Sequence, residues 1–249
     1  MRSTTDLLIF REHGTVTEIK QDVIHVTGLT NCMNGQLVSI AGHTDGVVLG
    51  FDDEYVLVLV VDEGGTIKPG DRVEAKLEEF RVPVGDAFLG RRVNALCKPI
   101  DGLGAIPESD KFPIFGVAPG VLERVPLSTA LEMGTKIADM ILPVGLGQRM
   151  LVLGDRMTGK TSLCLDAIVN QKGKNIFCIY CCIGKSDSAL TKVADTFSRC
   201  GVWDYGMILA ATAADPVGQQ YLAPYVAASL GEYFMQQGRD VLVVFDDCV

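Results

Sequence analysis

The chain has 249 residues, of which 48% are hydrophobic and 21% charged, a composition typical of a soluble globular protein with one large domain or two smaller ones. Its formal net charge of -9 argues against a nucleic-acid partner, because a surface that binds nucleic acid is basic. The longest apolar stretches, 55–61 and 241–245, are too short to cross a bilayer, so any membrane contact is expected only through partners. The first residues lack the layout of a secretory signal, which makes the cytosol the expected compartment.

Short runs rich in β-branched residues alternate with Gly, Asp and Asn turn residues from Gly14 to about Phe80. These runs are 15–19, 23–26, 36–40, 46–49, 55–61 and 72–75. Several short strands at this spacing predict a small antiparallel β-barrel or sandwich. We assign residues 1–80 to this N-terminal all-β domain.

Residues 81–249 are predicted to form a second, α/β domain. Turn formers predominate at 99–120, which indicates a linking segment, and from Gln148 onward apolar runs alternate with amphipathic stretches. This alternation predicts a parallel sheet with crossover helices. Strands are expected at 149–153, 175–183, 207–211 and 241–245.

Two helices are expected between these strands. One apolar face follows helical spacing through Leu190, Val193, Ala194 and Phe197. A second face is expected at Tyr221, Tyr225, Ala228 and Tyr233, on a helix that Gly238 can end.

Most of the eight cysteines lie inside apolar runs, which predicts buried, reduced thiols. They are Cys32, Cys97, Cys164, Cys178, Cys181, Cys182, Cys200 and Cys248. The spacing Cys178-x-x-Cys181-Cys182 could supply half of a metal site, but no second Cys or His pair stands at ligand spacing. We therefore expect core cysteines here.

The segment 154–161, Gly-Asp-Arg-Met-Thr-Gly-Lys-Thr, has the pattern of a P-loop. Glycines 154 and 159 allow the backbone to curl so that its N–H groups face phosphate oxygens. Lys160 supplies a cation for the β- and γ-phosphates, and the Thr161 hydroxyl is expected to ligate Mg²⁺. A chance glycine loop is the alternative, but apolar residues before the loop and a helical pattern after it favour a nucleotide site. The residues expected to bind the nucleotide are Gly154, Asp155, Arg156, Met157, Thr158, Gly159, Lys160, Thr161 and Ser162.

The apolar run 241–245 ends in Asp246-Asp247. A carboxylate at the end of a buried strand can hold Mg²⁺ through a water, although such a pair is equally often a helix cap. With a P-loop upstream the metal role is the favoured interpretation, and Asp246 is the preferred ligand.

Several segments together resemble the alpha subunit of the rotary proton-translocating ATP synthase, from about residue 14 to the end. They are the P-loop itself, 82–85, 89–91, 94–96, 99–102, 143–149, 220–225, 231–234 and 245–247. The resemblance implies a β-barrel followed by a RecA-like nucleotide domain that binds ATP or ADP with Mg²⁺. It also implies a hetero-oligomeric ring with catalytic beta-type subunits, a central-stalk subunit, and a peripheral location at the cytoplasmic face of a membrane. The family's arginine finger, adenine-contacting segment and helical domain would lie beyond Val249, so we expect a fragment or a truncated paralogue.

Two positions depart from the family pattern. Catalytic relatives carry Glu just after the second core strand and alpha subunits carry Gln, whereas this chain carries Lys185. An ammonium cannot accept a proton from water, so we predict no catalytic residue and expect Lys185 to strengthen nucleotide binding. The alternative is that Lys185 extends into solvent. Met157 replaces the usual Gln and is expected to weaken polar contact near the phosphates.

The predicted function is that of a non-catalytic, nucleotide-binding alpha-type subunit of the synthase head, contributing to proton-gradient-driven ATP synthesis or to ATP hydrolysis. Two alternatives stay open. A truncated paralogue could bind partners or regulate without turnover. An export-type hexameric ATPase is disfavoured by Lys185.

Overall fold

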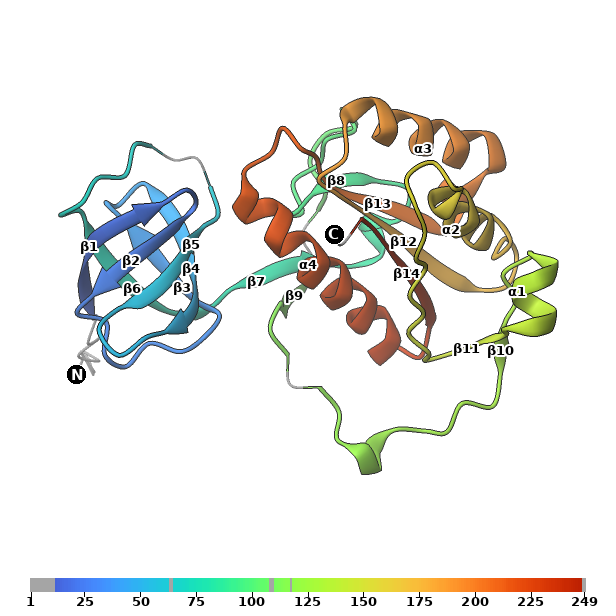
Figure 1. The fold of residues 1–249 in the computed structure, drawn as a ribbon, viewed down its shortest axis with the longest axis horizontal. Helices are drawn as coiled ribbons and strands as arrows, with labels where there is room; N and C mark the ends of the chain where they lie inside the picture. Colours follow the sequence, from blue (N-terminus) through green and yellow to red (C-terminus); the bar gives the residue numbers. More distant parts are fainter. Residues whose placement is uncertain (1–11, 63–64, 108–109, 117, 248–249) are drawn as a thin grey trace, which may run out of the picture. The chain divides into compact units, whose positions relative to one another are not determined.

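The computed structural model describes residues 12–62, 65–107, 110–116 and 118–247 (Figure 1). The predicted core cysteine Cys248 lies outside these residues. The chain divides into two compact units: the first runs to Phe80 and includes Pro216–Gly218, and the second holds the remainder. Within the described residues, no helix combines the length and the apolar character needed to cross a lipid bilayer.

The first unit is a closed antiparallel barrel, as the sequence predicts. Its strands are β1 (His13–Lys20), β2 (Val23–Thr27), β3 (Gln36–Ile40), β4 (Thr44–Phe51), β5 (Val56–Val60) and β6 (Arg72–Glu79). They pair in the order β1-β2-β5-β4-β3-β6, and β6 closes the barrel onto β1. Side chains on alternate positions fill the interior, among them Val16, Ile24, Val38 and Val58.

The second unit is built on a four-stranded parallel sheet in the order β14-β12-β13-β8. These strands are β8 (Arg92–Asn94), β12 (Ile176–Ile183), β13 (Gly206–Ala211) and β14 (Asp240–Asp246). Three of them confirm predicted strands, and β8 comes from the segment just before the predicted linker. The helices are α1 (Lys136–Ile141), α2 (Lys160–Val169), α3 (Asp187–Cys200) and α4 (Val217–Gln236).

Short elements complete the second unit. The strands β7 (Arg81–Val84) and β9 (Asp110–Pro113) pair antiparallel, as do β10 (Ala130–Leu131) and β11 (Val144–Gly145). Three short 3-10 helices are η1 (Asp86–Phe88), η2 (Val121–Glu123) and η3 (Val202–Asp204).

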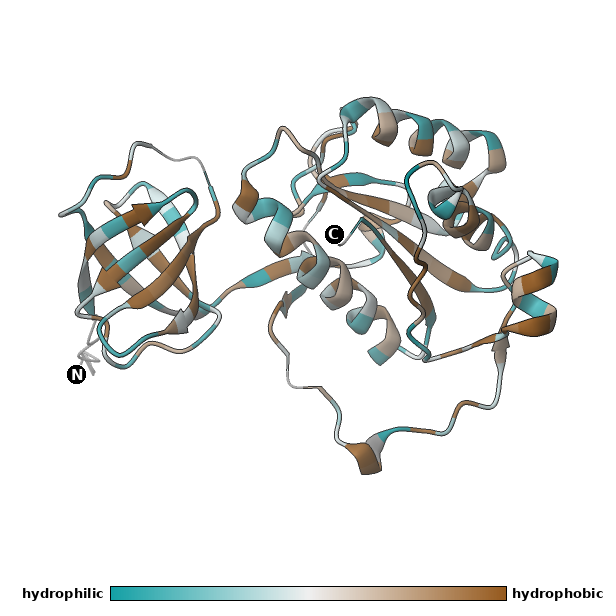
Figure 2. Cartoon of the chain, in the orientation of Figure 1, coloured by the Kyte–Doolittle hydropathy of each residue, from teal (hydrophilic) through white to brown (hydrophobic). Residues whose placement is uncertain are grey.

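The central strand β12 is buried on both faces, which explains its continuous apolar sequence. Cys178 and Tyr180 face the core shared with α2 and α3, whereas Phe177 and Ile179 face α4, where the Phe177 and Phe234 rings lie 4.2 Å apart. Helices therefore cover both faces of the sheet (Figure 1), and hydrophobic residues concentrate on its strands (Figure 2).

The amphipathic helix α3 forms as predicted. Leu190, Val193, Ala194 and Phe197 are all buried. Gly201, with φ of 70°, ends the helix in the left-handed conformation that glycine adopts readily. Beyond it, Trp203 packs edge-on against Phe197 at 5.1 Å between ring centroids and donates a hydrogen bond from Nε1 to Ser198 Oγ at 2.9 Å.

The loop after β8 is fixed by an ion pair between Arg91 and Asp101. Arg91 donates from Nε to Asp101 Oδ2 at 2.6 Å and from a terminal nitrogen to Oδ1 at 3.0 Å. The backbone N–H groups of Arg92 and Leu103 also donate to this carboxylate. Both charged side chains are largely buried, and the Asp101 side chain is only 5% exposed.

Two predictions about elements were wrong. Residues 149–153 pair with no strand of the described sheet, and Leu151 and Leu153 are each 77% exposed. On α4 the predicted aromatic face is the outer one, with Tyr221 42% and Tyr225 37% exposed. The buried face instead carries Leu222, Ala223, Val226, Ala227, Leu230 and Phe234. The helix does end just before Gly238, whose φ is 78°.

Candidate functional site

The P-loop leads directly into the first turn of α2. The helix begins at Lys160, and Gly159 precedes it with φ of 94°, a left-handed conformation that explains a glycine at this position. Met157 also has a positive φ, 63°. The N–H of Leu163 donates to Gly159 O at 3.0 Å, so the N–H groups before it at this helix end lack intrahelical partners and suit an anion.

The Lys160 side chain folds back over the loop. Its Nζ donates to Gly154 O at 2.6 Å and to Asp155 O at 2.8 Å, and the Thr158 hydroxyl donates to Asp155 O at 2.8 Å. A Cβ on Gly154 would stand 2.9 Å from Thr158 Oγ1, which is too close for an ordinary contact. Hydrogen bonds from the loop's own side chains thus hold its curved backbone conformation.

The other predicted nucleotide-binding residues lie on the open surface of the loop. Residues 154–159 are all exposed, and so is Ser162. Arg156 therefore presents its cation to solvent at the helix end, whereas the Met157 side chain is fully exposed and offers no strong hydrogen-bonding group. Such a loop is accessible to a phosphate chain.

Asp246 forms the centre of a hydrogen-bonded cluster beneath the first turn of α2. It is the last residue of β14, opposite Cys182 of β12. The Thr161 hydroxyl donates to its Oδ2 at 2.8 Å, and the phenol of Tyr180 donates to the same oxygen at 2.5 Å. The structure thus brings together the predicted pair Thr161 and Asp246 from positions 85 residues apart.

Lys185 completes this cluster. It follows β12 in the loop before α3, and its Nζ lies 2.5 Å from Asp246 Oδ1 and 3.2 Å from Thr161 Oγ1. Its side chain is 22% exposed. The alternative in which Lys185 extends into solvent is therefore wrong for this arrangement.

The cluster keeps Asp246 ionised. Burial alone would raise the pKa of this carboxyl, but hydrogen bonds from Lys185, Tyr180 and Thr161 outweigh burial and lower it. Burial and the hydrogen bond to Asp246 raise the pKa of Tyr180, so the phenol remains a proton donor. The Cys182 thiol, also buried nearby, has its pKa raised to about 11 and stays protonated.

The fit of Mg²⁺ to this cluster depends on position as well as donor type. A hydroxyl and a carboxylate are suitable ligands, and Thr161 and Asp246 supply them. The Lys185 ammonium, however, already contacts both residues, and Mg²⁺ would need their oxygens at about 2 Å with no competing cation. In this arrangement the residues do not fit Mg²⁺.

Tyr180 is the site residue that sequence reasoning missed. It stands in the middle of an unbroken apolar strand, where a tyrosine is indistinguishable from a core aromatic residue. The one signal in the sequence was the phenol hydroxyl of this tyrosine, because a buried phenol normally has a hydrogen-bond partner. Sequence alone could not identify that partner as Asp246, 66 residues away.

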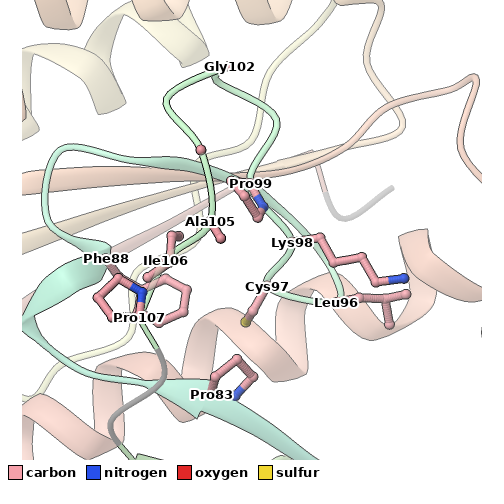
Figure 3. Close-up of a pocket in the computed structure, with 11 residues that line it drawn as sticks. Pro83, Phe88, Leu96, Cys97, Lys98, Pro99, Gly102, Ala105, Ile106 and Pro107 are labelled. Atoms are coloured by element: carbon pink, nitrogen blue, oxygen red, sulfur yellow. The ribbon is translucent and has the colours of Figure 1, made fainter.

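A separate cavity of about 680 Å³ lies among the loops between β7 and β9 (Figure 3). Apolar residues such as Phe88, Leu96 and Ile106 line it, and Lys98 is the charged residue among those lining it. No P-loop residue contributes to its wall. A polyphosphate requires several cations or N–H donors, so this cavity does not suit one.

Comparison with known proteins places the chain in a family. The nucleotide-binding domain of the ATP synthase alpha/beta family matches residues 134–249, and the β-barrel domain of that family matches residues 9–76. Together these matches cover more than half of the chain.

Individual relatives agree with this match. ATP synthase subunit alpha of Petrotoga mobilis is 41% identical over 241 residues, covering 95% of this chain and 48% of the relative. Subunit alpha of Clostridium botulinum is 43% identical over 237 residues, covering 95% and 47%. The chain spans about half the length of the curated relatives it matches. It therefore belongs to the ATP synthase alpha/beta family, within which it is similar to the alpha subunits.

Proposed function

We propose that this chain binds a nucleoside triphosphate at the loop 154–161 and holds it without hydrolysing it. The observation that carries the proposal is the position of Lys185, where its ammonium pairs with Asp246 beside the P-loop helix. Lys160 and the N-terminus of α2 supply the charge and N–H groups that favour phosphate. ATP or ADP is the ligand expected from the family.

The absence of turnover follows from the chemistry at position 185. Hydrolysis requires a group that accepts a proton from the attacking water, and an ammonium has no lone pair with which to accept it. Among the described residues of the cluster, the carboxylate of Asp246 accepts hydrogen bonds from three side chains. It is therefore poorly placed to take a further proton.

In the assembled complex, the proposal makes this chain an alpha-type member of a hetero-oligomeric ring with catalytic beta-type subunits and a central-stalk subunit. Its contribution to ATP synthesis or hydrolysis would then be indirect, at a peripheral position on the cytoplasmic face of the membrane. The curated relatives are named as alpha subunits, which supports this assignment. A regulatory paralogue without turnover is the second candidate, favoured by the same Lys185.

The test is a calorimetric titration of ATP into the purified chain and into Lys160→Ala. We expect saturable binding by the wild type and a loss of at least about tenfold in affinity in the variant, because a charge-assisted contact to phosphate is removed. Lys192→Ala, on the exposed side of α3, is the matched control and should bind as the wild type does.

Phosphate release measured on the same samples tests the second half of the proposal. We expect no release above the protein-free rate. ATP hydrolysis by the wild type that disappears in Lys160→Ala would contradict the non-catalytic assignment. It would not contradict the proposal that the wild-type chain binds nucleotide.

A further inference from the structure

The cation beside Thr161 and Asp246 is supplied by the chain itself. The Lys185 ammonium contacts Asp246 Oδ1 at 2.5 Å and Thr161 Oγ1 at 3.2 Å. These two side chains are the ones whose oxygens would otherwise ligate a divalent ion. A lysine that reaches both is positioned as a covalently attached counter-ion.

The hydrogen bonds of the cluster agree with the role of Lys185 as the counter-ion of Asp246. One oxygen of Asp246 accepts from Lys185, and the other accepts from Tyr180 and Thr161. The Thr161 hydroxyl donates to Asp246 and accepts from Lys185, so its O–H and one of its two lone pairs are in use. A metal ion could enter only by breaking contacts that already balance one negative charge with one positive charge.

Burial makes such an exchange costly. The side chains of Lys185 and Asp246 are 22% and 10% exposed, and Tyr180 beside them is fully buried. Removing one partner of a buried ion pair leaves the other charge uncompensated. If Mg²⁺ lay beside the ammonium the two cations would repel each other, and if it displaced the ammonium Lys185 would lose its carboxylate partner.

We propose that Lys185 replaces Mg²⁺, so that the P-loop of this chain binds nucleoside triphosphate as the metal-free polyanion. Lys185 has three N–H groups, and its contacts with Asp246 and Thr161 occupy two of them, which leaves one for a phosphate oxygen. Lys160, whose Nζ donates to the carbonyl oxygens of Gly154 and Asp155, supplies a second cation at the P-loop. This inference rests on nucleotide binding at the P-loop, and it adds that the binding needs no divalent ion.

The test is calorimetric titration of ATP into the 249-residue chain in excess EDTA and in millimolar MgCl₂, for the wild type and Lys185→Gln. We expect wild-type affinity in EDTA to equal or exceed that in Mg²⁺. In Lys185→Gln, Asp246 loses its cation, so binding should become at least about tenfold weaker in EDTA than in Mg²⁺. Lys192→Gln should behave as the wild type in both media.

Three results would overturn the inference. Wild-type binding that weakens about tenfold or more in EDTA would show that Mg²⁺ is required, while nucleotide binding itself would stand. A Lys185→Gln variant with no Mg²⁺ dependence would show that Lys185 does not act as the cation. A folded wild-type chain that binds no ATP in either medium would refute the proposed function and this inference with it. If Lys185→Gln does not fold, as judged by circular dichroism, the wild-type comparison alone decides.

Discussion

Asp246 shows how one buried carboxylate can depend on several hydrogen-bond donors. Tyr180 is fully buried and donates to it at 2.5 Å, from a strand whose other side chains are apolar. Removing this hydroxyl leaves the carboxylate, whose side chain is only 10% exposed, with one donor fewer. The residue therefore contributes to stability and to the ionisation state of the site together.

Tyr180→Phe should lower the free energy of unfolding by about 1–2 kcal/mol at neutral pH, because a hydrogen bond to a charged group is lost. The pKa of Asp246 is lowered in the folded state, so its stabilising contribution exists above about pH 4 and disappears as the pH falls. The difference between variant and wild type should shrink accordingly in acid. Urea unfolding followed by circular dichroism at several pH values measures both effects.

Tyr221→Phe is the matched control, because its hydroxyl meets only the Tyr225 hydroxyl at 3.3 Å in a partly exposed place. We expect a change within about 0.5 kcal/mol. Equal destabilisation by the two substitutions would contradict the role given to the Tyr180–Asp246 bond.

At the residue scale, sequence reasoning identified the parts of the site that carry a motif. Gly159 has the left-handed conformation that a glycine allows, and Thr161 lies beside Asp246, although the two are joined by a direct hydrogen bond where Mg²⁺ ligation was predicted. The direction of Lys185 could not be predicted, since a lysine side chain reaches either solvent or a buried partner depending on what the folded chain places nearby. That partner lies 61 positions further along the chain.

At the scale of elements, an apolar sequence does not by itself establish burial or strand pairing. The predicted strand 149–153 has the apolar sequence of a buried strand but pairs with none of the described strands, since backbone pairing depends on a neighbour that hydropathy does not reveal. On α4 apolar residues lie on all sides, so periodicity could not decide which face packs against β12 and β14. In α3, where charged residues occupy one side, the same reasoning succeeded.

The loop after β8 provides an element-scale prediction. Asp101→Asn should lower the free energy of unfolding by about 3 kcal/mol, because Arg91 would remain buried without its countercharge. The hydrogen bonds from Arg91, and to a lesser degree from backbone N–H groups, hold the pKa of Asp101 well below its usual range. The contribution of Asp101 to the free energy of unfolding is therefore complete above about pH 4 and declines as the pH falls further.

Thermal unfolding from neutral to acid pH measures this effect. The wild type should lose stability in acid more steeply than Asp101→Asn, which lacks the titrating group. Asp195→Asn, on the exposed side of α3, is the control and should leave the profile unchanged. Parallel wild-type and Asp101→Asn profiles would argue that the pair adds no pH-dependent stability.

At the scale of the whole molecule, each unit has a hydrophobic core of its own. Ile24 belongs to the barrel core, whereas Phe197 belongs to the core of the second unit. The all-β character of the barrel was predictable because six short strands with turn residues between them lie in one segment, a pattern typical of small barrels and sandwiches. The parallel sheet was predicted less completely, because β8 joins it from a segment far upstream of the other three strands.

Ile24→Ala should destabilise the barrel by about 2–5 kcal/mol through the cavity it leaves. Hydrogen exchange measured by mass spectrometry should therefore accelerate in peptides from β2 to β5, with little change in peptides from β12 and β13. Uniform acceleration across both units would show that they unfold together.

Trp203 is the only tryptophan in the chain, and it lies at the end of α3 against Phe197. Its indole emission is consequently an intrinsic optical probe of the second unit, with no indole in the barrel to mask it. A red shift on denaturation would report water reaching this part of the core. The wild-type chain thus carries a single-site fluorophore that needs no labelling, and its signal can be separated from the tyrosine emission of the barrel.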